Sequence, residues 1–154
     1  MKRKFETEID VAFPPVEAIH LFTPKGEEAW VPGWRPRFID PPSGKTVSGM
    51  VFETGEGEER TIWTCLSYDP RAGEASYLRL VPDTRISRVE VSCRENVRGG
   101  SAVTVRYEHV ALTDAGESWL ADQTQGAFEA DIGKWRHFIE AAIGEGRISV
   151  STAA

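Results

Sequence analysis

The chain is poor in cysteine, in histidine and in positive charge. Its 154 residues include two cysteines and three histidines, and 18 basic against 24 acidic side chains give a net charge of −6. Cys65 and Cys93 lie in different predicted strands without the spacing of metal ligands, so we expect both to be reduced core residues. The acidic balance disfavours nucleic acid and anionic membrane as partners, because both attract basic surfaces.

Long apolar runs are also missing. No segment approaches the roughly 18 apolar residues that a membrane-spanning helix needs. The opening Met-Lys-Arg-Lys is followed by Phe-Glu-Thr-Glu and not by an apolar signal segment, so the sequence predicts a cytoplasmic protein. Forty per cent hydrophobic residues are enough for one globular core. We expect a single domain over residues 1–148, followed by a frayed tail over 149–154.

Sequence motifs for metal, phosphate or dinucleotide binding are absent. The chain has no G-x-S-x-G, no P-loop and no dinucleotide fingerprint. His20, His109 and His137 lie far apart in the sequence, and no two of them have the spacing that places ligands on one helical face. The sequence therefore predicts neither a metal site nor a bound cofactor.

What the chain does have is a strong helical pattern at its C-terminal end. Thr113 is a typical N-cap, and Gly144 and Gly146 are typical of a helix end, so the pattern predicts one long helix over residues 113–144. Apolar or small residues recur on one face of that helix: Leu120, Thr124, Phe128, Ile132, Trp135, Phe138, Ile139, Ala142 and Ile143. A face this wide must be buried, and a sheet is the natural partner.

Strands are predicted upstream of the helix. They cover residues 5–13, 37–39, 49–54, 60–68, 75–81, 86–97 and 101–112, with proline- and glycine-rich turns between them. Short helices are predicted over residues 16–22 and from Pro24 to about Ala29, both of them after the first strand. Short connections between successive strands are typical of an antiparallel meander.

The alternation of side chains predicts which face of the sheet is buried. A three-residue loop over 98–100 sets Val97 opposite Ser101. Val89, Val91 and Cys93 then share the inner face with Val103, Val105, Tyr107 and His109. The same reasoning at the preceding turn predicts Leu78 and Leu80 inside, and Tyr77 and Arg79 outside.

Three local motifs resemble one superfamily. They are the strand–proline–helix opening Phe13-Pro14-Pro15-Val16-Glu17, the segment Trp30-Val31-Pro32-Gly33-Trp34, and the last strand Val103–Glu108 leading into the Thr113 cap. Together with the order of elements, they resemble the START-like, Bet v 1-like (SRPBCC) superfamily of polyketide cyclases, dehydrases and lipid-transport proteins. The resemblance implies an α+β helix-grip fold, in which a curved seven-stranded antiparallel sheet wraps around a long C-terminal helix. It also implies a hydrophobic cavity between the sheet and the helix.

The candidate site follows from the inner face and from the aromatic side chains. As cavity lining for a hydrophobic small molecule that is lipid-like, aromatic or polyketide-like, we expect Trp30, Trp34, Phe52, Trp63, Leu78, Val91, Tyr107, His109, Thr124 and Phe128. The ordinary interpretation of the aromatic set is core packing, which Phe128 and Trp135 fit best because helices dock through such residues. Tyr107 and His109 are also candidates for proton transfer, although buried polar groups usually only find hydrogen-bond partners.

Three functions remain open at this point. The first is a carrier or sensor of a hydrophobic small molecule. The second is an enzyme of the cyclase or dehydrase type that uses Tyr107 and His109. The third is a protein-binding module that resembles the chaperone-activator branch of the same fold and uses the exposed face of the sheet.

A further pattern lies on the opposite side of the predicted helix. Trp119, Gln123, Gly126, Ala130, Gly133 and His137 fall near one line. Small residues allow close approach of another backbone, so Trp119, Gly126, Ala130 and Gly133 form a hypothetical homodimer surface. Plain solvent exposure is the alternative, because exposed glycines and single exposed aromatics are common.

Overall fold

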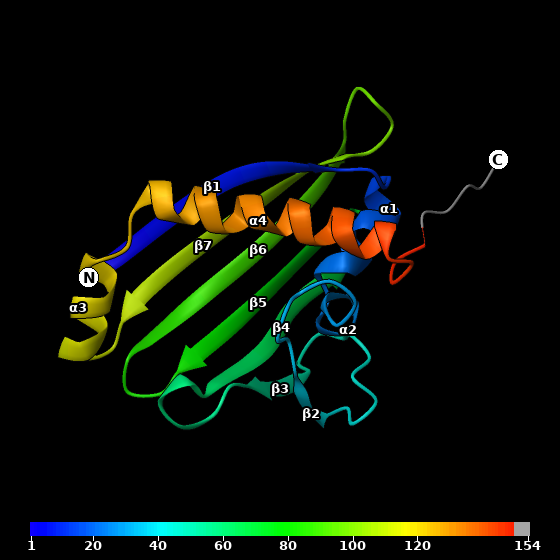
Figure 1. Ribbon diagram of the computed structural model, residues 1–154. Helices are drawn as coiled ribbons and strands as arrows, with labels where there is room; N and C mark the ends of the chain where they lie inside the picture. Colours follow the sequence, from blue (N-terminus) through cyan, green and yellow to red (C-terminus); the bar gives the residue numbers. More distant parts are fainter. Residues whose placement is uncertain (150–154) are drawn as a thin grey trace.

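The computed structural model describes residues 1–149, and the predicted frayed tail lies outside these residues apart from Ser149. Seven strands form one antiparallel sheet in the order β1-β7-β6-β5-β4-β3-β2 (Figure 1). They are β1 (Lys2–Val11), β2 (Arg37–Asp40), β3 (Val51–Thr54), β4 (Thr61–Asp69), β5 (Glu74–Val81), β6 (Arg85–Glu95) and β7 (Ser101–Ala111). The helices are α1 (Pro15–Ala18), α2 (Pro24–Glu27), α3 (Asp114–Ala121) and α4 (Gln125–Gly144), with 3-10 turns at Ile19–Phe22 and Gly57–Glu59.

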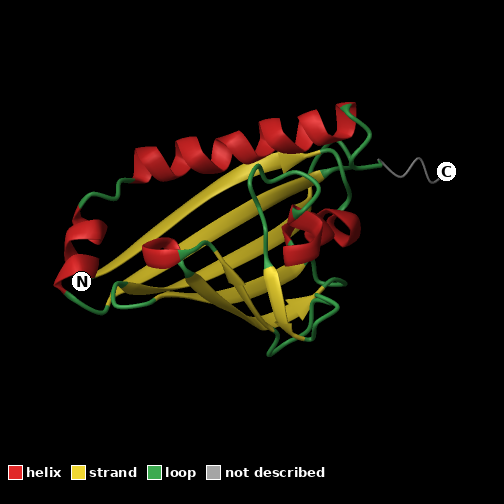
Figure 2. Cartoon of the chain, turned by 60° about the horizontal axis from the view of Figure 1, so that its bottom comes forward, coloured by secondary structure: helices red, strands yellow, loops and turns green. Residues whose placement is uncertain are grey.

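The sheet curves beneath α4, which lies across its concave face (Figures 1 and 2). In β1 every buried side chain, Phe5, Ile9 and Val11, belongs to the face that α4 covers. Helix α4 buries Phe128, Ile132, Ile139 and Ala142 in the same core. Helices α1 and α2 lie near the C-terminal end of α4, whereas α3 lies at its other end (Figure 1). This arrangement is the predicted helix-grip fold.

The prediction of one continuous helix over residues 113–144 is wrong, because the chain leaves the helix between α3 and α4. Thr124 has extended backbone angles (φ −129°, ψ 153°), and its side chain accepts a hydrogen bond from the Ala127 N–H at 3.1 Å. Thr124 is therefore the N-cap of a second helix, a position that threonine favours. Thr113 caps α3 as predicted, since its hydroxyl accepts from the Gly116 N–H.

The register predicted for the last hairpin is wrong by two residues. Glu95 pairs with Ser101, so the loop runs from Asn96 to Gly100 and is longer than predicted. The Asn96 side chain holds this loop, because it accepts hydrogen bonds from the N–H groups of Arg98 and Gly100. A shift of two residues keeps each side chain on its face of the sheet. Tyr107 and His109 therefore do lie on the inner face, opposite Val89 and Ser87.

The faces predicted for β5 are reversed in the structure. Tyr77 pairs with Val89 and Arg79 pairs with Ser87, which places Tyr77 and Arg79 on the inner face and Leu78 and Leu80 on the outer one. The inner position of Tyr77 is stabilised by a hydrogen bond, since its hydroxyl donates to the Phe22 carbonyl at 3.0 Å. Hydrophobicity alone favours the leucines for the inner face. Leucine, however, cannot donate the hydrogen bond that the buried Phe22 carbonyl accepts from Tyr77.

Candidate functional site

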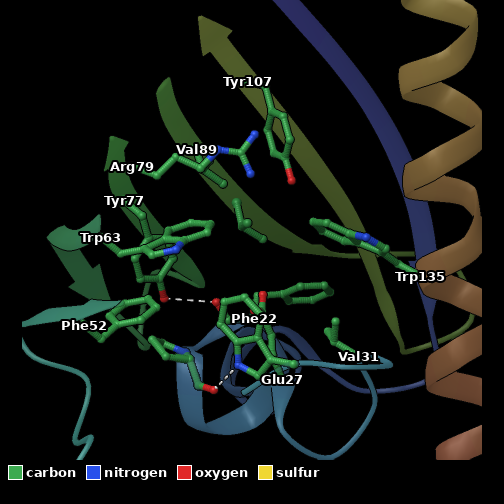
Figure 3. A pocket seen from close by; sticks show the side chains of 13 residues that line it. Phe22, Glu27, Val31, Phe52, Trp63, Tyr77, Arg79, Val89, Tyr107 and Trp135 are labelled. Atoms are coloured by element: carbon green, nitrogen blue, oxygen red, sulfur yellow. Dashed lines mark hydrogen bonds between the residues drawn. The ribbon is translucent and has the colours of Figure 1, made fainter. Parts of the chain in front are cut away.

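A cavity of about 140 Å³ lies between the concave face of the sheet and α4 (Figure 3). The sheet contributes its wall from β3 to β7, the segment after β1 closes one end, and Trp135 reaches in from α4. Its lining residues are Phe22, Pro24, Glu27, Val31, Trp34, Phe52, Trp63, Tyr77, Arg79, Val89, Val91, Tyr107 and Trp135. Most of this wall is aromatic or aliphatic, so the cavity favours an apolar occupant.

The aromatic part of the wall is rigid. The rings of Phe52 and Trp63 stack nearly in parallel, with centroids 5.5 Å apart and an interplanar angle of 9°. Trp34 meets both rings edge-on, and its indole N–H donates to the Pro24 carbonyl at 2.8 Å. Trp63 donates its own indole N–H to Thr54 at 2.9 Å. Because the indoles are held by these bonds, their faces are fixed toward the cavity.

Arg79 is the one arginine of this wall. Its guanidinium carbon lies 5.4 Å from the centre of the Trp63 ring and 5.0 Å from that of Tyr107. The Nε–H of Arg79 is buried, and among residues 1–149 it has no hydrogen-bond partner. Contact with two aromatic faces stabilises a cation, but it does not replace the hydrogen bonds that the group loses on leaving water.

Glu27 faces the same cavity from the last turn of α2 (Figure 3). Burial raises the pKa of this carboxyl to about 8, against the opposing attraction of Arg79. The side chain is partly exposed toward the cavity, but the aromatic and aliphatic side chains that surround it leave the charged form poorly solvated. At neutral pH Glu27 is therefore mainly a neutral acid that can donate a hydrogen bond.

A second cavity, of about 240 Å³, adjoins the first and shares Arg79, Tyr107 and Trp135 with it. It is formed mainly by the first turns of α4 and the facing ends of β1 and β7. Its other lining residues are Phe5, His109, Trp119, Gln123, Thr124, Ala127, Phe128, Asp131 and Ile132. Thr124, Ala127 and Asp131 are solvent-exposed, so this cavity opens to the surface beside the break between α3 and α4.

His109 belongs to the wall of the second cavity and is 3% exposed. Its Nδ1 shares a hydrogen bond of 2.6 Å with the Ser87 hydroxyl, and its ring packs edge-on against Trp119 and Tyr107. Burial, together with the positive charges of Arg79 and Arg85, lowers the pKa of His109 to about 4. The imidazole is therefore neutral at neutral pH and is a weak base.

Comparison with solved structures identifies the architecture. A structure of norcoclaurine synthase from Thalictrum flavum in complex with dopamine and hydroxybenzaldehyde superposes with a TM-score of 0.64 at 10% identity, over 92% of this chain and 88% of that one. The structure of Ara h 8.0201 gives 0.64 at 16% identity over 94% and 97% of the two chains. A protein from Rhizobium loti gives 0.55 at 19% identity, again over 94% and 97%.

The chain has the Bet v 1-like (SRPBCC) fold. No protein-family model matches its sequence, and no curated protein matches it either. At these identities the likeness concerns the fold alone, so the chemistry of the cavity follows from its own residues.

Eight of the ten residues predicted to line the site border one of the two cavities. The first cavity is lined by Trp34, Phe52, Trp63, Val91 and Tyr107, and the second by Tyr107, His109, Thr124 and Phe128. Trp30 borders neither, because it is buried beneath the wall, where its indole N–H donates to the Leu21 carbonyl at 2.7 Å. The prediction for Leu78 is wrong, since Leu78 lies on the outer face.

The sequence pattern does not reveal the polar members of the wall. The reasoning at the turn before β6 predicts Arg79 on the outer face, and the local signals predict Glu27 only as part of a short helix. A signal for Glu27 was present, because Thr23-Pro24 predicts a capped first turn that presents the residue three positions after Pro24 toward the core. No comparable local signal marks Arg79.

Two further findings concern the rest of the described residues. Within residues 1–149, no three His, Cys, Asp or Glu side chains lie close enough together to hold a metal ion. None of the helices in this part of the chain has the length and apolar character needed to cross a membrane.

The line of small residues predicted on the back of the C-terminal helix is divided by the break at Thr124. Trp119 does not continue the line, because its ring packs on His109 and under Arg85. Gly126, Ala130 and Gly133 remain on α4, where an added Cβ at either glycine would meet no atom within 4 Å.

Proposed function

We propose that the protein binds a hydrophobic small molecule in the cavity between the sheet and α4. The observation that carries this proposal is an internal wall of aromatic and aliphatic side chains whose rings are held in place by hydrogen bonds and stacking. A preformed apolar cavity with few polar groups is the usual form of a small-molecule site. The outer face of the sheet instead carries charged side chains paired with one another, such as Lys2 and Glu108 at 3.0 Å.

The volumes set the size of the ligand. An engineered apolar cavity of about 150 Å³ is known to accept benzene, so the first cavity of about 140 Å³ has room for one aromatic ring. The adjoining space of about 240 Å³ lies beyond Tyr107 and Trp135. A ligand that reaches from one to the other would have two or three rings, or one ring with a short acyl chain. The norcoclaurine synthase structure holds two single-ring compounds, dopamine and hydroxybenzaldehyde, in a protein of the same fold.

A fluorescent neutral probe tests the proposal. N-phenyl-1-naphthylamine has no charge and becomes bright in an apolar site, so titration should give saturable binding to the wild-type protein. Val89→Phe adds a ring inside the cavity that Val89 lines and should weaken binding by about tenfold or more, since the added atoms occupy the ligand's space. The matched control is Thr104→Phe, which places the same ring on the outer face of β7.

Probe binding to the wild-type protein and to the two variants distinguishes a ligand site from a cavity without one. Saturable binding that Val89→Phe weakens and Thr104→Phe preserves supports the proposal, and native mass spectrometry of the purified protein would add the mass of any retained ligand. If the probe does not bind to the wild-type protein, or binds equally to both variants, the cavity is not a ligand site.

A second candidate function is acid–base catalysis on the bound molecule. The observation in its favour is Glu27, a carboxyl that faces the cavity and whose pKa is raised to about 8. Catalytic acids with such values are typical of active sites, because they carry a proton at neutral pH and can give it up. Tyr107 faces the same space, and burial raises its pKa, so its hydroxyl stays protonated. His109, with a pKa of about 4, is the weaker partner for this chemistry.

Variants distinguish an enzyme from a carrier once a substrate is in hand. An enzyme that uses Glu27 should lose turnover in Glu27→Gln while its ligand affinity is kept, and Tyr107→Phe and His109→Ala test the other two residues in the same way. A carrier should show binding without turnover in the wild-type protein. The third interpretation, a protein-binding module, requires that changes at Arg88, Arg94 or Arg106 on the outer face alter function while Val89→Phe does not.

A further inference from the structure

Arg79 stands at the centre of the inner face of the sheet, where a cation is costly. It lies in the middle of β5, paired with Trp63 of β4 on one side and with Ser87 of β6 on the other. Its guanidinium borders both cavities. A cation in such a place is expected to have a charged partner, because burial without one is strongly unfavourable.

The acidic groups that face Arg79 do not supply that partner. Glu27 approaches from α2 and Asp131 from α4, but in the part of the chain that the structure describes, neither forms an ion pair with Arg79 within 4.0 Å. Asp131 lies instead 3.7 Å from Lys134. Burial raises the pKa of Glu27 to about 8, so Glu27 is mainly uncharged at neutral pH.

The other polar groups near Arg79 add no negative charge. Tyr107 contributes a protonated phenol, His109 a neutral imidazole, and Ser87 is bonded to His109. Arg85 of β6 adds a second positive charge. Its guanidinium carbon lies 3.4 Å from the centre of the Trp119 ring, and its buried Nε–H also finds no partner within the described chain. With Glu27 neutral, the first cavity of this protein of net charge −6 is therefore lined by one charge, the positive charge of Arg79.

We propose that the ligand is an organic anion, with an aromatic or acyl body in the cavity and a carboxylate bound by Arg79. This inference deepens the proposed function and rests on it. The guanidinium is a planar fork of N–H donors that matches a carboxylate in two parallel hydrogen bonds. A carboxylate in contact with Arg79 supplies both the missing charge and the missing acceptor, while the rings of Trp63, Tyr107 and Trp135 surround the ligand's body.

Arg85 packs against the ring of Trp119 and lines a separate surface hollow together with Pro82, Asp83 and Thr84. It does not line the second cavity, where Arg79 is the basic residue. Arg85 therefore adds to the positive field around Arg79 without contacting a ligand in either cavity.

The melting temperature of an Arg79 variant distinguishes a structural role of Arg79 from a role in ligand binding. If the guanidinium served the fold, its removal would lower the melting temperature. If its charge serves a ligand, Arg79→Met removes a partly buried charge that has no ion-pair partner, keeps an unbranched apolar stem, and should raise the melting temperature of the free protein by about 3 °C or more.

The direct test compares two ligands that differ in charge and hardly in shape. Naphthalene-2-carboxylate and naphthalene-2-carboxamide are titrated calorimetrically at pH 7 into the wild-type protein, Arg79→Met, Arg79→Gln and Arg88→Met. Arg88→Met is the matched control, because Arg88 is exposed on the outer face of β6. The wild-type protein and Arg88→Met should bind the carboxylate at least about tenfold more tightly than the amide. Arg79→Met and Arg79→Gln should lose that preference and keep the amide affinity within about threefold.

Each outcome of this titration either supports or contradicts the inference. Loss of the charge preference in the Arg79 variants alone supports the inference, and a wild-type preference of tenfold or more supports it even if one variant fails to fold. If N-phenyl-1-naphthylamine binds but the wild-type protein shows no preference for the carboxylate, or if the preference survives at Arg79→Met, the inference is overturned and the proposed function stands. If neither naphthyl compound nor the neutral probe binds, the proposed function itself fails.

Discussion

The guanidinium carbon of Arg79 lies 5.0 Å from the centre of the Tyr107 ring, within the space that α4 covers. Tyr107 thus meets its neighbours through its ring, which also lies 5.0 Å from the ring of Phe128. Tyr77, two residues from Arg79 on the same face, is held through its hydroxyl instead, by the bond to the Phe22 carbonyl. Two tyrosines on one face of the sheet therefore have different roles.

This difference leads to a paired prediction on stability. Tyr77→Phe leaves the buried Phe22 carbonyl without its donor and should lower the free energy of unfolding by about 1–2 kcal/mol. Tyr107→Phe should change it by less than about 0.5 kcal/mol, because among residues 1–149 the Tyr107 hydroxyl has no hydrogen-bond partner. Urea unfolding of both variants measures the pair. Equal losses at the two positions would show that Tyr107 also holds the fold through its hydroxyl.

The raised pKa of Glu27 predicts that the folded protein loses stability as the pH rises. Its carboxyl has a pKa of about 8 in the folded protein and an ordinary value of 4.5 when it is solvated, so the folded state holds one more proton between these values. The contribution of Glu27 is complete below pH 4.5 and is lost as the pH rises to 8, with a slope of at most about 1.4 kcal/mol per pH unit. Glu27→Gln should remove this slope and be more stable than the wild-type protein at pH 8. A constant difference between the two proteins from pH 5 to 8 would contradict the raised pKa.

The lowered pKa of His109 predicts that the folded protein loses stability as the pH falls below about 6.5. Burial, together with Arg79 and Arg85, lowers its pKa to about 4 from an ordinary value of 6.5, so the unfolded chain binds the extra proton between these values. The stability that the neutral imidazole contributes is present above pH 6.5 and is lost as the pH falls toward 4. His109→Gln can still bond to Ser87 and should flatten this part of the profile. Denaturant unfolding between pH 4 and 7 checks it, and an unchanged acid limb would mean that His109 is protonated in the folded protein.

The fold was accessible from the sequence because its signals are long and repeated. Strand ranges, turn residues and the apolar face of the C-terminal helix all agree with one architecture, and such agreement between levels is what a foldable sequence provides. The break at Thr124 was missed because threonine fits the inner face of a helix as well as it fits an N-cap. Only the neighbouring chain, including the Arg3 side chain that donates to the Gln123 carbonyl at 2.9 Å, shows which of the two applies.

The candidate site was less accessible, because its polar residues break the rule used to find the inner face. Trp63 and Phe52 are expected in the wall because they belong to the aromatic set, and both border the first cavity. Arg79 and Leu78 were exchanged because the more apolar residue was assigned to the interior. Departures of this kind are expected where a protein keeps a charge inside for its function. An arginine at this inner position is consistent with a ligand that complements its charge.

The outer face of α4 allows a prediction on helix stability and on association. Gly133 lies inside the helix with open space where a Cβ would be, so Gly133→Ala should raise the free energy of unfolding by about 1 kcal/mol. A homodimer that packs another backbone against Gly126, Ala130 and Gly133 would reverse this sign, and Gly133→Lys would then dissociate it. Light scattering on the eluting wild-type protein and Gly133→Lys distinguishes these outcomes. A dimer that persists in Gly133→Lys would show that this face is not its interface.

The opening beside the break between α3 and α4 predicts how a ligand enters. Ala127 is exposed and lines the second cavity, so Ala127→Trp places an indole in its mouth without changing the first cavity. The association rate of N-phenyl-1-naphthylamine should fall by about tenfold or more in stopped-flow fluorescence, because a ligand must displace this ring to pass. Ala130→Trp is the matched control, since Ala130 is exposed on the same helix and lines neither cavity. If both variants bind the probe at the wild-type rate, the ligand enters elsewhere, and the segment from Pro24 to Trp34 that borders the first cavity is the next place to test.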